Sequence, residues 1–168
     1  MDPNHYRFRG VWRLAAPAPA VYAALEDVRS YPLWWPEVLE VRETGARSGQ
    51  AVVRALLPYR LVIDLEARRQ DPAAGVLEAT MRGDLDGWSR FTVTADGPGG
   101  TRCRVLFEED ARPGKPLLRR LALPLHLLFR ANHAVMMHRG RRGLAAYLTG
   151  GGGEDGGDDD DERGTANR

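Results

Sequence analysis

Hydrophobic and polar residues alternate at the start of the chain, over residues 6–14. One side of this segment carries Tyr6, Phe8, Gly10, Trp12 and Leu14, and the other side is mainly arginine. A period of two predicts a β-strand with one solvated face. The prolines and helically spaced apolar residues of the next segment, APAPAVYAALEDV, predict a short helix. Two prolines bracket the YPLWWP segment that follows, which therefore has room only for a turn or a helical stub.

Short apolar runs separated by Gly, Pro and Asp turns fill residues 38–110. Near-regular spacing of this kind is typical of an antiparallel meander. Six strands are predicted, over residues 40–43, 51–57, 60–68, 76–82, 88–95 and 102–109. A six-residue turn, GARSGQ, separates the first two.

The period changes to 3.6 after residue 116, and an apolar stripe then runs from about residue 118 to about residue 147. This predicts a long helix with a kink near Pro124. Some 30 helical residues span on the order of 45 Å, so the helix must lie along the sheet. The prediction is an α+β fold in the order strand, helix, helical stub, six strands and long helix. A curved antiparallel sheet would wrap around the C-terminal helix and leave a gap between them.

The last 19 residues differ from the rest in composition. Residues 150–168 are rich in Gly and Asp and contain seven acids and two arginines. They contain no large apolar side chains whose burial could offset the entropy cost of ordering the backbone. A disordered acidic tail is therefore predicted after a folded domain at residues 1–149. Without the tail, the net charge rises from +1 to about +6. Such a surface attracts anions weakly, but the basic residues do not form a nucleic-acid-reading motif.

Composition narrows the class of protein further. Arginine supplies 23 of the 24 basic residues, which is typical of a GC-rich bacterial genome. The N-terminus lacks the apolar core of a signal peptide, and no apolar stretch is long enough to span a membrane, so a cytoplasmic protein is expected. Cys103 is the single cysteine and is expected to be a buried small hydrophobe. No metal-ligand, nucleotide or serine-nucleophile motif is present, so neither a metal nor a cofactor is predicted.

The order of the elements, and the residues that separate them, resemble those of the START-like helix-grip superfamily, also called SRPBCC. Within it, the chain is similar to the bacterial polyketide cyclase/dehydrase and lipid-transport type. The resemblance covers residues 6–148 and rests on the segments FRGVWRLAAPAPAVYAAL, SYPLWWPEV, GDLDGWSRFTV, GGTRCRVLFEE and NHAVMMHRGRRGLAAYL. It implies a cavity between the sheet and the long helix for an apolar or polycyclic ligand.

The leading hypothesis is therefore a carrier or sensor of a hydrophobic small molecule, lipid-like or polyketide-like. The resemblance places the two tryptophans of YPLWWP near the cavity mouth, where they either gate it or cap the end of the sheet. The residues predicted to contact the ligand are Trp12, Trp34, Trp35, Ile63, Met81, Trp88, Phe107, Asn132 and Met136. Gly140 and Gly143 in the long helix predict a close approach by a strand.

Three side chains are candidates for catalysis. Glu109 shares strand parity with Phe107, which predicts an inward carboxylate, while Arg90 shares parity with Trp88 and has no clear side. His133 would move protons if it faced the cavity. The alternative function is thus an aromatase/cyclase that closes and dehydrates a poly-ketone chain without metal or nucleotide.

Arginines along the outer side of the long helix suggest a third alternative, a partner-binding module. Its partner would be an acidic carrier protein or an anionic lipid surface. The ligand, the pathway, the oligomeric state and the role of the tail stay open at this point.

Overall fold

The computed structural model describes residues 5–54, 59–116, 120 and 126–150. Its elements are β1 (Tyr6–Leu14), α1 (Ala18–Glu26), the 3-10 turn η1 (Val28–Ser30), α2 (Tyr31–Trp34), β2 (Val38–Gly45), β3 (Ser48–Arg54), β4 (Arg60–Asp71), β5 (Val76–Gly83), β6 (Leu85–Ala95), β7 (Cys103–Pro113) and α4 (His126–Gly150). This confirms the predicted α+β order of strand, helix, helical stub, six strands and long helix.

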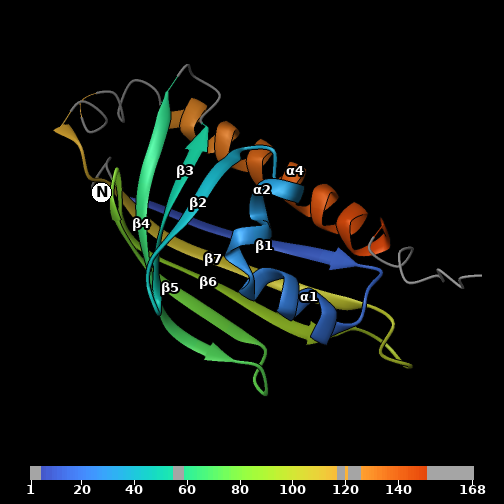
Figure 1. Ribbon diagram of the computed structural model, residues 1–168. Coiled ribbons are helices and arrows are strands. Elements are labelled where there is room, and N and C mark those ends of the chain that lie inside the picture. The colour runs from blue at the N-terminus through green and yellow to red at the C-terminus, as the bar shows by residue number, and fades with distance from the viewer. Residues whose placement is uncertain (1–4, 55–58, 117–119, 121–125, 151–168) are drawn as a thin grey trace, which may run out of the picture.

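The strands form one seven-stranded antiparallel sheet in the order β1-β7-β6-β5-β4-β3-β2. Strands β2 to β7 are a meander, and β1 completes the sheet by pairing with the last strand. The sheet is strongly curved, and α4 runs along its concave side together with α1 and α2 (Figure 1). This is the helix-grip arrangement that the sequence predicts.

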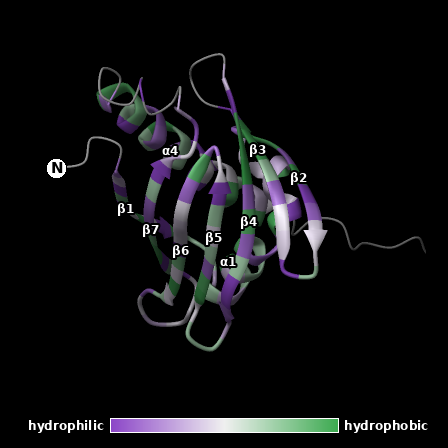
Figure 2. Ribbon diagram, turned by 90° about the vertical axis from the view of Figure 1, so that its left-hand side faces the viewer, coloured by the Kyte–Doolittle hydropathy of each residue, from purple (hydrophilic) through white to green (hydrophobic). Residues whose placement is uncertain are grey.

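Residues of opposite character alternate along the strands (Figure 2). The register aligns the inward positions across strands, so that Phe91 of β6 lies opposite Phe107 of β7. The inward side chains and the helices form the main core, in which Cys103 is fully buried as expected. Burial of this apolar area supplies the main stabilisation of the fold.

Some predicted boundaries differ from the observed ones. Only Ala46 and Arg47 separate β2 from β3, where a six-residue turn is predicted, because Gly45 and Ser48 are still paired. The end of the predicted strand 51–57, the kink at Pro124 and the start of the long helix lie outside the described residues. The predicted tail does so too, apart from Gly150, which ends α4.

The two glycines of α4 mark the place where α2 docks. A Cβ on Gly143 would lie 1.6 Å from the carbonyl oxygen of Trp34, and one on Gly140 would lie 2.6 Å from the Trp35 ring. The prediction of a strand at this point is therefore wrong, because the neighbour is a helix with two large aromatic rings. None of the described helices is long and apolar enough to cross a membrane.

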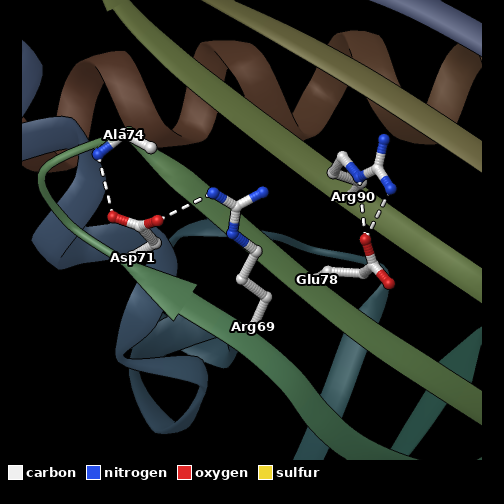
Figure 3. Close-up of polar contacts among 5 residues, drawn as sticks. All are labelled: Arg69, Asp71, Ala74, Glu78 and Arg90. Carbon is white, nitrogen blue, oxygen red and sulfur yellow. Dashed lines mark hydrogen bonds and ion pairs between the residues drawn. The ribbon is translucent and has the colours of Figure 1, made fainter.

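The turn between β4 and β5 is organised by Asp71 (Figure 3). Its carboxylate accepts a hydrogen bond from Arg69 at 2.7 Å and another from the Ala74 N–H at 2.9 Å. The bond from Arg69, followed by that from Ala74, lowers the pKa of Asp71 below its ordinary value. This turn lets β5 return beside β4 and present its inner face to the cavity described next.

Candidate functional site

The inner face of the sheet carries two separate apolar clusters. The main core lies against the helices, and the second cluster has Ile63, Met81 and Ala111 at its centre. Helix α4 packs mainly against α2, α1 and β1, and it lies farther from the middle strands of the sheet. The apolar inner face of those strands therefore borders a cavity.

The cavity has a volume of about 220 Å³ and lies between the concave sheet and α4. Its lining is mainly apolar and rich in aromatic rings. The residues are Tyr6, Phe8, Val28, Tyr31, Trp35, Val38, Val41, Ala51, Val53, Arg54, Leu61, Ile63, Leu65, Met81, Leu85, Ser89, Phe91, Phe107, Glu109, Pro113, Phe129, Asn132, His133, Met136 and Met137. A concave apolar site with a few polar groups is the usual form of a small-molecule site.

A carboxylate and an imidazole meet inside this lining. Glu109 lies opposite Ser89 of β6 and Phe8 of β1, which places its side chain on the inner face. Its Oε2 is 3.4 Å from Nε2 of His133 on α4. The side chains are only 10% and 14% exposed, so the pair is largely shielded from water. Partners from the sheet and the helix thus form one polar spot in an apolar cavity.

Aromatic rings hold the imidazole of His133 in place. The Phe8 ring stacks on it with a centroid distance of 3.6 Å and an interplanar angle of 10°. The Phe107 ring lies 5.8 Å away at an angle of 27°. These contacts fix the plane of the imidazole, so its edge stays directed at Glu109. A carboxylate oriented in this way can accept a hydrogen bond from a ligand or exchange a proton with the imidazole.

Tyr31 also borders the cavity, but its hydroxyl is engaged elsewhere. The hydroxyl donates a hydrogen bond of 2.7 Å to the carbonyl oxygen of Leu25. Burial, together with the nearby charge of Asp27, raises the pKa of Tyr31 well above its ordinary value. The phenol therefore stays protonated at neutral pH and serves the packing of α2 rather than proton transfer.

Eight of the predicted site residues line the cavity. They are Trp35, Ile63, Met81, Phe107, Glu109, Asn132, His133 and Met136. Their roles toward a ligand stay predictions. Four others, Trp12, Trp34, Trp88 and Arg90, are not among the cavity-lining residues.

The tryptophans of α2 and β1 are packed in the core. Trp34 is 4% exposed and stacks on Trp35 at 5.4 Å, while Trp12 meets Trp35 edge-on at 5.9 Å. The indole N–H of Trp35 donates a hydrogen bond of 3.0 Å to the carbonyl oxygen of Met136. Of the three rings, only that of Trp35 reaches the cavity, which it borders beside α4.

Arg90 and Trp88 lie on the outer face of the sheet. Arg90 pairs with Glu78 of the neighbouring strand at 2.6 Å (Figure 3), and its guanidinium lies 5.2 Å from the centre of the Trp88 ring. Ser89, between them, points inward. Alternation along β6 requires this arrangement, because inward Phe91 leaves the even-numbered neighbours outside.

The sequence also contains cavity residues that are absent from the prediction, among them Phe8, Ser89, Phe91 and Phe129. Phe8 and Phe91 share strand parity with the predicted residues Trp12 and Phe107 through the observed register. Phe129 lies one helical turn before His133, on the same face of α4. Strand parity with Trp12 and helical spacing from His133 are therefore sequence signals for Phe8 and Phe129, whereas Phe91 and Ser89 are related to Phe107 and Glu109 by the observed register. Within the described ranges, no group of three His, Cys, Asp or Glu side chains could hold a metal ion.

The basic side of α4 is only partly available to a partner. Arg130 and Arg142 are exposed, whereas Arg139 pairs with Glu37 at 3.0 Å. Docking of an acidic carrier protein or an anionic lipid surface stays a prediction.

Residues 6–148 match the family model described as polyketide cyclase/dehydrase and lipid transport. No curated protein matches the chain.

Solved structures share the fold at low sequence identity. The Zhui aromatase/cyclase from Streptomyces sp. R1128 is 14% identical, with a TM-score of 0.69 over 86% of this chain and 94% of that chain. A protein from Thermus thermophilus is 18% identical, with a TM-score of 0.70 over 88% and 99% of the two chains. A START superfamily protein from Mycobacterium smegmatis is 12% identical, with a TM-score of 0.64 over 86% and 97%.

Proposed function

Because the chain belongs to the polyketide cyclase/dehydrase and lipid transport family, we propose that it binds a hydrophobic small molecule between the sheet and α4, as a carrier or sensor. The observation that carries the proposal is the apolar cavity of about 220 Å³. Filling such a space with side chains would stabilise the protein, since cavities in a core are costly. A cavity that is kept open is better explained by an occupant.

The volume limits the size of that occupant. An apolar cavity of roughly 150 Å³ accepts benzene. At about 220 Å³, this cavity has room for about two fused rings, or for one end of a longer molecule. Naphthalene is therefore a suitable minimal probe.

Filling the cavity is expected to weaken binding of this probe strongly. Ala51 lines the cavity from β3 and is 6% exposed, so Ala51→Phe would place a phenyl ring in the ligand volume. In an NMR titration with naphthalene, the indole N–H of Trp35 should shift in the wild type, since Trp35 borders the cavity. We expect the affinity for naphthalene to fall by about tenfold or more in the variant. The free energy of the lost apolar contact is at least as large as the free energy that corresponds to a tenfold change in affinity.

Ala146→Phe is the matched control, because Ala146 lies on the exposed side of α4. It should bind naphthalene like the wild type. Equal affinity in wild type and Ala51→Phe would contradict the proposal.

The Glu109–His133 pair favours a second candidate function, an aromatase/cyclase. Glu109 would remove a proton from the carbon between two ketones, and that carbon would attack a third carbonyl of the same chain. His133 would supply a proton to the new alkoxide, and loss of water would follow. The fold shared with the Streptomyces aromatase/cyclase and the 3.4 Å contact between carboxylate and imidazole support this candidate.

Removing the carboxylate charge is expected to slow such a cyclisation by about 100-fold, the usual contribution of a general base. The measurement is the rate of ring closure of a poly-β-ketone thioester analogue by wild type and Glu109→Gln. Arg90→Ala is the control, since Arg90 pairs with Glu78 on the outer face. Identical rates and products for all three proteins would remove the cyclase candidate and leave the binding function.

A further inference from the structure

We infer that the Glu109–His133 pair makes the cavity selective for an uncharged ligand carrying a hydroxyl group, against a carboxylate of the same shape. This rests on the proposed binding function and specifies its ligand class. Glu109 is 10% exposed, and its carboxylate faces an otherwise mainly apolar lining. A ligand that fills the cavity therefore places atoms beside this carboxylate.

The described residues that line the cavity include no cationic side chain at this end. Arg130, whose guanidinium lies 6.0 Å from the centre of the Phe8 ring, is exposed and is not among them. Among the described lining residues, the other side chain with a permanent charge is Arg54. It lies on β3, four strands from β7 in the sheet order, and is exposed. His133 is already engaged by Glu109 at 3.4 Å. An ionised carboxylate beside an imidazole leaves the pair with no net positive charge.

A ligand carboxylate at this position would be repelled. Two carboxylates in a largely dry site disfavour each other's charged forms, and removing a carboxylate from water is costly in itself. A hydroxyl behaves in the opposite way, because it donates a hydrogen bond to the Glu109 oxygen. Hydrogen bonds to a charged acceptor are stronger than those between neutral groups.

The neighbouring rings also suit a flat hydroxylated ligand. Phe8 stacks on His133, and Phe91 and Phe107 lie with their ring centres 5.0 Å apart on the adjoining strands. Glu109 lies two residues beyond Phe107 on the same inner face of β7, so a ring packed on Phe107 lies beside its carboxylate. A hydroxyl in the plane of that ring can then reach Glu109.

Three probes of nearly equal shape test the inference: naphthalene, 2-naphthol and 2-naphthoate. Titrations followed by NMR are expected to show 2-naphthol binding the wild type about tenfold more tightly than naphthalene, as one charge-assisted hydrogen bond predicts. 2-Naphthoate should bind at least about tenfold more weakly than 2-naphthol, because its charge is unpaired.

Variants assign the selectivity to Glu109. In Glu109→Gln the penalty on 2-naphthoate should shrink, and in Glu109→Met the advantage of 2-naphthol over naphthalene should disappear. Naphthalene binding reports that each variant keeps its cavity. Glu108→Gln is the matched control, since Glu108 lies on the outer face beside Arg9 and Arg90, and it should retain the wild-type selectivity.

Failure of the inference differs from failure of the proposed function. Equal affinities of 2-naphthol and 2-naphthoate, or unchanged selectivity in the Glu109 variants, would overturn the inference while naphthalene binding upheld the function. If no probe shifted the Trp35 indole resonance, both would be overturned.

Discussion

An alanine at position 143 is expected to lower the free energy of unfolding by about 3 kcal/mol, at the upper end of the usual range for overpacking. Its Cβ would lie 1.6 Å from the carbonyl oxygen of Trp34 and 2.8 Å from the carbonyl carbon. Both atoms belong to the backbone, so no side-chain rotation relieves the clash. The gain in helix propensity of about 1 kcal/mol is too small to offset it.

Urea unfolding followed by circular dichroism measures this loss. Gly150→Ala is the control in the same helix, because a Cβ there meets nothing within 4 Å. It should leave stability nearly unchanged. If Gly143→Ala were as stable as the control, the close docking of α2 on α4 would be refuted.

The same contact matters for the cavity. Trp35 follows Trp34 directly, borders the cavity and donates its indole N–H to the carbonyl oxygen of Met136. A displaced α2 would move this ring and change the space between α4 and the sheet. We therefore expect the glycine to support ligand binding through position, without contacting the ligand.

Replacing Asp84 with alanine is expected to cost a similar amount, about 3 kcal/mol, because it breaks a buried polar junction. Asp84 is 2% exposed and lies at the corner between β5 and β6. One carboxylate oxygen accepts a hydrogen bond of 2.9 Å from the Val62 N–H, and the other lies 2.6 Å from the Lys115 ammonium. Alanine would leave the Val62 N–H without its acceptor and the lysine without its counter-ion.

Urea unfolding again provides the measurement, with Asp64→Ala as the control. Asp64 is an exposed carboxylate of β4 that accepts a hydrogen bond of 2.8 Å from the side chain of Gln50. Its loss should cost about 0.5 kcal/mol or less. An equally small effect at both positions would show that the corner does not depend on the buried carboxylate.

Several elements could be predicted because their signals are local. Period-two runs, Gly and Pro turns and a 3.6-residue stripe identify the strands and the long helix without any information on long-range contacts. Strand parity also placed Glu109 inward. The same rule, applied from Phe91 and Val93, places Arg90 outside. Applied from Trp88 it gives no clear side, because a tryptophan tolerates either face.

The sequence by itself determined the order of the elements and the apolar face of each one, since both depend on side chains a few residues apart. Only the tertiary structure decided which distant residues meet. His133 faces Glu109, and Trp34 rests on Gly143, across separations that no local pattern reports. Periodicity tells which side of an element faces its partner, but it contains no information on the distance between them. That distance leaves the cavity between α4 and the middle strands of the sheet open.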